Sequence, residues 1–147
     1  MVNIRESSET ELESFLAMER QPHAKAFINS IDLLTHKRNF SKPDIVYLSI
    51  ENNSGELAGY FILVSDSEKK EVEFRRIVID HSQQGIGQIA ISEMEIYCGD
   101  KLNAERIWLD VYEDNARGKH VYEKLGYKYF RDEIYHGRRL LFYQKLF

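Results

Sequence analysis

Apolar residues recur along this chain with two spacings, which divide it into predicted strands and helices. Short apolar runs, or apolar residues alternating with polar ones, are typical of strands, whereas apolar residues three or four positions apart are typical of amphipathic helices. By this criterion, strands are predicted at residues 2–5, 44–51, 57–64, 71–80, 106–112, 127–131 and 139–146. Helices are predicted from residue 8 onward and at residues 23–38, 85–100 and 115–125.

The order of these elements predicts the fold class. The strands at 44–51 and 57–64 are separated by a short loop containing Gly55, which is typical of a β-hairpin, and the last two strands form a second hairpin. A strand–helix–strand unit lies between the two hairpins. We therefore expect a single α/β domain over residues 1–147, with one mixed, twisted sheet and helices on both of its faces.

Composition and charge exclude several classes of protein. The formal net charge of −4 over 147 residues is opposite to the basic surface of a general nucleic-acid-binding protein. No window approaches the ~20 apolar residues of a membrane span, so we expect a cytoplasmic protein without a nucleic-acid or membrane partner. The single cysteine, Cys98, lies in an apolar helical pattern typical of a packed thiol. The five histidines form no metal-binding pair, and no metal is expected.

A glycine turn between a strand and a helix carries the first chemical signal. The strand at 71–80 is followed by a polar loop, and Gly85-x-Gly87 then opens the next helix. Free backbone N–H groups and the positive end of a helix dipole at this point make a site for phosphate. Alternatively, the glycines only permit a tight turn.

The same turn also fits a loose dinucleotide-binding fingerprint, completed by Ala90 and a distant acid at Asp110. Two observations count against a dinucleotide fold. Several polar residues separate the strand from Gly85, and too few residues follow Asp110 to complete a doubly wound sheet. A kinase-type P-loop is excluded because no Gly-Lys-Ser/Thr follows the glycines.

Two motifs in the expected order resemble the GCN5-related N-acetyltransferase superfamily. The first is the loop Ser82–Gly87, and the second comprises Trp108–Val111, Asn115 and Tyr122–Tyr127. Within the superfamily, the chain is most similar to the RimI/RimL-like branch, which acts on protein N-termini and small amines. It departs from the family pattern at Ser82, where arginine or glutamine is usual, and at Gly118, which is a poor helix former.

The resemblance implies a fold and a cosubstrate. The expected sheet has seven mostly antiparallel strands and splays between the fourth strand, at 71–80, and the fifth, at 106–112. Acetyl-CoA would lie in the splay, with its pantetheine arm on the backbone of Ile77, Val78 and Ile79. Its pyrophosphate would rest on the backbone N–H groups of Gln83, Gln84, Gly85, Ile86, Gly87 and Gln88. Asn115 would hydrogen-bond either the cofactor or the glycine loop.

The implied reaction is direct attack by a primary amine, from a protein N-terminus or a small molecule, on the thioester. Only ~0.04% of a lysine-like amine is neutral at pH 7, so a general base is needed. Asp110 is the first candidate and Glu73 the second, and the third alternative is that no single residue is the base. The Tyr122 hydroxyl would protonate or hydrogen-bond the departing thiolate. Tyr60, Glu73 and Tyr135 could hold the amine.

Two other functions stay open. A catalytically idle acyl-CoA-binding module would have the same fold, and a dinucleotide-dependent oxidoreductase would bind NAD(P)H instead of CoA. The apolar last strand could pair across a homodimer, so either a monomer or a homodimer is expected.

Overall fold

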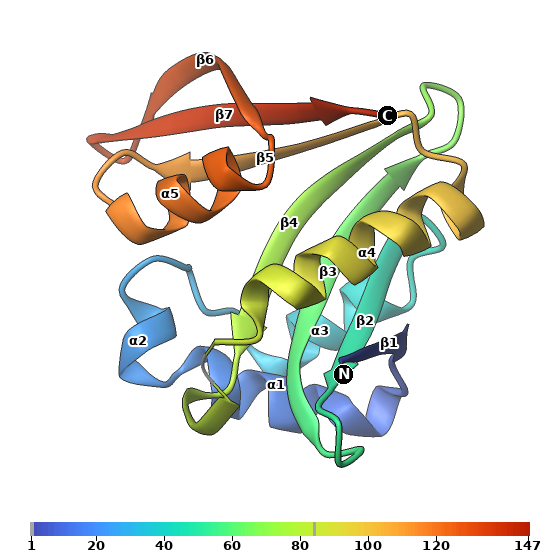
Figure 1. The fold of residues 1–147 in the computed structure, drawn as a ribbon. Coiled ribbons are helices and arrows are strands. Elements are labelled where there is room, and N and C mark those ends of the chain that lie inside the picture. Colours follow the sequence, from blue (N-terminus) through green and yellow to red (C-terminus); the bar gives the residue numbers. More distant parts are fainter. Residues whose placement is uncertain (1, 84) are drawn as a thin grey trace.

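Seven strands form one mixed sheet in the computed structural model, which describes residues 2–83 and 85–147 (Figure 1). Their order across the sheet is β1-β2-β3-β4-β5-β7-β6. All neighbouring strands are antiparallel except β4 and β5, which are parallel. The strands are β1 (Asn3–Glu6), β2 (Ile45–Glu51), β3 (Leu57–Asp66), β4 (Glu71–Ile79), β5 (Arg106–Tyr112), β6 (Lys128–Tyr135) and β7 (Arg138–Leu146). The predicted fold class and the splayed seven-stranded sheet are confirmed.

Helices cover both faces of the sheet and give it two hydrophobic cores. Helices α4 (Gly87–Leu102) and α5 (Ala116–Lys124) lie on one face, over a core that includes Met94 and Cys98. Burial raises the pKa of the Cys98 thiol to about 12, as expected for the packed thiol predicted from sequence. On the other face, α1 (Leu12–Glu19) and α3 (Leu33–Phe40) cover a core with the stacked rings of Phe15 and Tyr60. Among the described residues, no helix is both long and apolar enough to cross a membrane.

The parallel strands β4 and β5 diverge soon after they begin. They pair only at Glu71–Arg106, Val72–Ile107 and Glu73–Trp108, and then separate toward α2 (Pro22–Lys25) and α5 (Figure 1). Just beyond the last pair, Arg75 is an extra residue relative to β3, so β4 carries a β-bulge there. Because a bulge bends a strand and increases its twist, it directs the second half of β4 away from β5.

One predicted helix is wrong in its extent. The pattern at 23–38 predicted a single helix, but α2 is a single turn that ends at Lys25, and α3 begins only at Leu33. Pro22 starts the first turn, where its missing N–H costs nothing. Asp32 starts the second helix, because its carboxylate accepts a hydrogen bond from the Thr35 N–H at 2.8 Å. Residues 26–32 therefore form a loop between the two helices.

Other boundaries shift by a few residues. The helix expected from Gly85 begins at Gly87 and extends to Leu102, because Asn103 ends it in the left-handed conformation. The strand predicted at 127–131 continues to Tyr135 as β6. This strand lies at the edge of the sheet and is largely exposed, so its polar residues weakened the strand signal.

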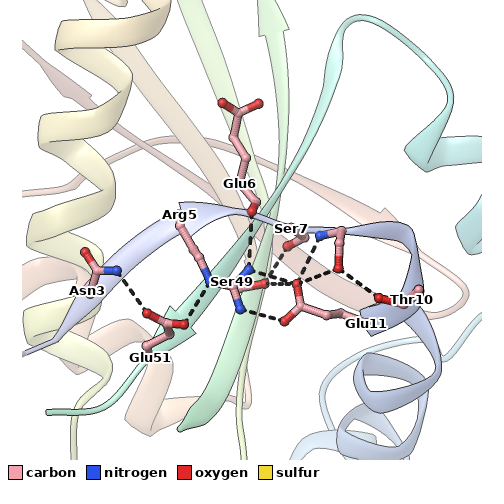
Figure 2. A network of polar contacts seen from close by, with 9 residues as sticks. Asn3, Arg5, Glu6, Ser7, Thr10, Glu11, Ser49 and Glu51 are labelled. Carbon is pink, nitrogen blue, oxygen red and sulfur yellow. Dashed lines mark hydrogen bonds and ion pairs between the residues drawn. The ribbon is translucent and has the colours of Figure 1, made fainter. Parts of the chain in front are cut away.

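Polar side chains fix the start of the chain to the sheet (Figure 2). Arg5 lies between two carboxylates and donates to Glu11 at 2.8 and 2.9 Å and to Glu51 at 2.9 Å. The hydrogen bond from Arg5 is the main cause that lowers the pKa of Glu11 to about 2. Glu11 also accepts from the Ser8 N–H and the Ser49 hydroxyl, which ties the turn before α1 to β2.

Candidate active site

A cavity of about 1000 Å³ lies where β4 and β5 diverge. Its walls come from five parts of the fold: the outer half of β4, the start of α4 with the loop before it, the end of β5 with α5, the β6–β7 hairpin, and the segment around α2. These parts are far apart in sequence, and the splay brings them together. The cavity lies at the position that the sequence predicted for acetyl-CoA.

At one end of the cavity, the N-terminus of α4 presents backbone N–H groups that no side chain of the described residues caps. Its N-cap is Ile86, which has no side-chain acceptor, and the first turn contains no acidic residue. Gly87 and Gln88 of this turn line the cavity. Such a helix end binds an anion through its N–H groups and its dipole. Gly85 precedes it with a φ of +102°, a conformation that favours glycine.

Most of the predicted cofactor-binding residues lie on the cavity wall. These are Ile77, Val78, Ile79, Gly85, Gly87, Gln88 and Asn115. Ile86 does not line the cavity, although it caps the helix. The Gln83 N–H donates to the Asp80 carbonyl at 2.9 Å, and the Gln83 side chain accepts from Asn52 at 3.1 Å, so Gln83 is engaged within the protein. Gln84 lies outside the described residues.

The register of β4 shows which backbone groups face the splay. The Asp80 N–H donates to Ala58 of the neighbouring β3 end at 2.8 Å, and hydrogen-bonded pairs alternate along antiparallel strands. Val78 therefore directs its backbone groups toward β3, whereas Ile77 and Ile79 direct theirs away from it. No strand lies opposite Ile77, because β5 pairs with β4 only as far as Glu73. Ile77 can thus bind an extended ligand as a further strand would.

Asn115 and Gly118 form a single unit at the start of α5. The Asn115 side-chain oxygen accepts a hydrogen bond from the Gly118 N–H at 2.9 Å and so caps the helix. A Cβ at position 118 would lie 2.7 Å from the Asn115 amide nitrogen. The glycine that seemed unfavourable from sequence is therefore what allows Asn115 to fold over the helix end. Both residues line the cavity.

Asp110 is a carboxylate without a protein partner. It lines the cavity from β5, and no hydrogen bond or ion pair joins it to the described residues. Water reaches it through the cavity, yet surrounding protein removes much of its hydration. This burial, together with the negative charge of nearby Glu73, raises the pKa of Asp110 to about 6. A carboxylate with that pKa is ionised at neutral pH and accepts a proton more readily than ordinary aspartate.

Glu73, the second candidate base, is already paired. Its carboxylate accepts from Arg75 at 2.9 and 3.1 Å, and its side chain is only 17% exposed. A proton on Glu73 would weaken that ion pair, whereas a proton on Asp110 breaks no contact. Of the two predicted candidates, Asp110 is thus the carboxylate without an ion pair, and the charge of Glu73 contributes to its raised pKa.

Tyr122 lies on α5 and faces the same cavity. Its ring packs edge-on against Phe74 at 5.8 Å and Tyr127 at 6.2 Å between centroids, so its orientation is fixed by the core. Burial, and secondarily the charge of Asp110, raises the pKa of its hydroxyl to about 12. The hydroxyl is therefore protonated at neutral pH, and the charge of Asp110 contributes to its raised pKa.

The opposite end of the cavity includes residues that sequence reasoning missed. Arg131 and Glu133 of β6 point into it and form an ion pair at 2.8 Å. Their alternation along a strand was the available signal, but the strand was predicted to end at 131. Tyr135 lines the cavity as predicted. The prediction for Tyr60 is wrong, because this residue is fully buried and donates to Glu19 at 2.5 Å, outside the cavity.

A family model identifies the family to which this fold belongs. The model of the acetyltransferase (GNAT) family matches residues 5–127. The chain belongs to this family. No curated protein matches the sequence significantly. Among solved structures, the spermidine N-acetyltransferase from Vibrio cholerae in complex with CoA and spermine is similar over 99% of this chain and 95% of that one, with 16% identity and a TM-score of 0.87.

A dodecameric structure of the spermidine N-acetyltransferase from Vibrio cholerae, in an intermediate state, is also similar. It covers 99% of this chain and 93% of its own, with 16% identity and a TM-score of 0.80. At these identities the likeness shows the fold. The RimI/RimL-like branch that the sequence favoured stays a prediction.

As a member of this family, the protein is an acetyltransferase that uses acetyl-CoA as its cosubstrate. The cavity fits that cosubstrate by three observations on the chain itself. The uncapped α4 N-terminus offers donors to a pyrophosphate, and Ile77 offers backbone groups that pair with no strand of the described residues to a pantetheine amide. Position 85, in the loop between them, is a glycine and has no side chain.

Proposed function

We propose that this acetyltransferase acetylates a primary amine, on a small molecule or a protein N-terminus, by direct attack on the thioester of acetyl-CoA. The observation that carries the proposal is the unpaired Asp110 carboxylate, which shares one cavity with the Tyr122 hydroxyl. An ammonium group in the cavity could form an ion pair with the Asp110 carboxylate, which forms none with the described residues.

Asp110 and Tyr122 have different parts in this reaction: Asp110 accepts a proton, and Tyr122 donates a hydrogen bond. Asp110 takes a proton from the substrate ammonium, directly or through water, and the amine nitrogen can then attack the thioester carbonyl carbon. The N–C bond forms, the C–S bond breaks, and the electron pair of the C–S bond leaves with sulfur. Tyr122 donates a hydrogen bond to this thiolate. Of the two protons that the ammonium nitrogen loses, one ends on the thiolate sulfur and the other is released to solvent, which returns Asp110 to its ionised form; the products are an N-acetylated amine and CoA thiol.

The end of the cavity that is lined by Glu73, Asp110 and Glu133, which we call the acceptor end, has a charge that supports a cationic substrate. Glu73, Asp110 and Glu133 all line this part of the cavity, while Arg75 and Arg131 are each neutralised by a glutamate. Asp110 thus leaves one negative charge to be balanced. The similar enzyme whose structure contains CoA and spermine acts on a polyamine, which makes polyamines the first acceptors to test and N-terminal peptides the second.

The test is a screen of amines with acetyl-CoA, in which free CoA thiol and the acetylated amine are both quantified. We expect equal amounts of the two products with at least one primary amine, and none with the corresponding tertiary amine. Binding of CoA, seen as thermal stabilisation, without turnover on any amine would favour the idle acyl-CoA-binding module. Stabilisation by NADH or NADPH alone would favour the oxidoreductase.

The assembly state is a separate part of the proposal. A monomer or homodimer is expected from sequence, and one similar structure is dodecameric. Light scattering after size-exclusion chromatography distinguishes these states. A mass above that of a dimer would contradict the expectation.

A further inference from the structure

The cavity wall next to the acceptor end is a loop with little structure of its own. Residues 20–32 connect α1 to α3 and contain only the single turn α2. Ala24, Phe27, Ile28 and Asn29 of this segment line the cavity. We call residues 20–32 the acceptor-side segment. Because so little helix holds it, its position depends on side-chain contacts with the rest of the protein.

The first half of the acceptor-side segment is bound to the end of β4. The Gln21 amide donates to Asp80 at 2.9 Å and accepts from the His81 N–H at 3.0 Å. The His23 ring nitrogen Nε2 lies 2.7 Å from the Ile79 carbonyl oxygen, to which it donates. These contacts fix the start of the segment relative to the cofactor end of the cavity.

The second half is bound to a fully buried carboxylate, Glu19, at the end of α1. Glu19 accepts from the Ser30 hydroxyl at 3.0 Å and from the Ile31 N–H at 3.3 Å, both in the acceptor-side segment. The same carboxylate accepts from His36 at 3.1 Å and from Tyr60 at 2.5 Å. Four donors from three parts of the chain thus converge on Glu19.

Arg76 of β4 completes this arrangement and joins it to the cavity. One of its guanidinium nitrogens donates to Glu19 at 2.9 Å, and the other donates to the Asn29 carbonyl at 2.7 Å. Its side chain is 12% exposed and lines the cavity. One planar guanidinium therefore bridges the buried carboxylate and the segment, a geometry that the point charge of lysine cannot reproduce.

We infer that Glu19 and Arg76 are positioning residues for the acceptor: they hold Phe27–Asn29 against the cavity through Ser30, Ile31 and the Asn29 carbonyl. The inference rests on the proposed function, since it concerns the amine-binding side of the same cavity. It assigns these residues no contact with the reacting atoms. Loosening the segment weakens amine binding and leaves the cofactor end and the chemical step intact.

Ser30→Ala is the mildest test, because it removes one hydrogen bond to Glu19 from a residue that does not itself line the cavity. We expect the KM for the amine to rise about three- to tenfold, less than the full effect of a hydrogen bond to a charged group, because Ser30 acts on the amine only through the position of the segment. The kcat at saturating amine and the KM for acetyl-CoA should not change. Ser41→Ala is the matched control, because its hydroxyl bonds a backbone carbonyl at the end of α3, away from the cavity.

Arg76→Lys and Arg76→Met separate positioning from stability. Lysine retains the charge beside Glu19, so it should restore most of the thermal stability lost in Arg76→Met. It cannot bridge to Asn29 as well, and its KM for the amine should stay raised about tenfold. Full rescue of KM by lysine would overturn the inference, and so would an unchanged KM in both Ser30→Ala and Arg76→Lys.

Hydrogen exchange gives a readout that needs no turnover. Amides of the acceptor-side segment should exchange several-fold faster in Ser30→Ala and Arg76→Met than in the wild type, while those of α4 should be unchanged. Unchanged exchange in the segment would overturn the inference. If the wild type acetylated no amine, the proposed function would fail, and exchange alone would then decide whether Glu19 and Arg76 hold the segment.

Discussion

Replacing Tyr122 with phenylalanine removes one hydroxyl from the cavity and almost nothing else. The ring is held by edge-on contacts with Phe74 and Tyr127, which phenylalanine preserves. No hydrogen bond joins the Tyr122 hydroxyl to the described residues, so its loss leaves no protein group unsatisfied. Any large change in rate therefore reports on the reaction and not on the fold.

The size of the effect follows from the raised pKa of Tyr122, about 12. A CoA thiol has a pKa of roughly 8.5 by analogy with cysteine, so complete proton transfer from tyrosine to thiolate is uphill by about 3.5 pKa units, or about 5 kcal/mol. Tyr122 therefore stabilises the leaving thiolate mainly as a hydrogen-bond donor. A hydrogen bond to a charged group contributes about 1.5–3 kcal/mol, which predicts a loss of about 10- to 150-fold in kcat.

Steady-state kinetics with the best amine from the screen measure this effect. We expect kcat to fall by that factor in Tyr122→Phe, with the dissociation constant of acetyl-CoA changed less than about threefold and the Tm nearly constant. An unchanged kcat from pH 6 to pH 9 would refute the role of Tyr122. A loss of kcat accompanied by equally weakened acetyl-CoA binding would also refute it, because the hydroxyl would then serve ground-state binding.

Three further substitutions test other parts of the account. Asp110→Asn should lower kcat about 10²- to 10⁴-fold, as loss of a general base does. It should also raise the Tm at pH 7, because the raised pKa of Asp110 means that its ionised form destabilises the folded state. Calorimetry should show that this gain disappears below about pH 4, where Asp110 is protonated in both the folded and the unfolded state. Glu19→Gln should cost about 3–5 kcal/mol in urea unfolding, and a loss under about 1 kcal/mol would contradict the buried ion pair. Burial alone would raise the pKa of Glu19, but hydrogen bonds from His36 and Tyr60 and the charge of Arg76 lower it to about 2, so this cost should shrink as pH falls from 4.5 toward 2. Gly118→Ala should raise the KM for acetyl-CoA by displacing Asn115, and a gain of about 1 kcal/mol in stability, as helix propensity alone predicts, would contradict this reading.

The fold was largely predictable because its signals are local. Alternating and helical patterns located the strands and most helices, and the resemblance to the acetyltransferase family implied the splay between β4 and β5. The break between α2 and α3 was not predicted, since the apolar spacing continued through it. Pro22 and the Asp32 cap were visible in the sequence and could have revealed two separate helix starts.

The site was predictable only where a motif marked it. Asp110, Asn115 and Tyr122, which belong to one motif, all line the cavity. The contacts of Glu19 link residues 19, 36, 60 and 76, and no periodic pattern connects such distant positions. One signal was present: Glu19 continues the stripe of Leu12 and Phe15, so a charge occupied a core position of its helix.

The pH dependence of kcat/KM for the amine tests the central claim most directly, namely that the unpaired carboxylate of Asp110 serves as the base for acetylation of an amine. With saturating acetyl-CoA, we expect kcat/KM for the amine to rise with pH up to an apparent pKa near 6, that of Asp110 before the amine binds, and then to level off. This rise should be absent from the residual activity of Asp110→Asn. The same rise in the variant, or none in the wild type, would show that Asp110 is not the base.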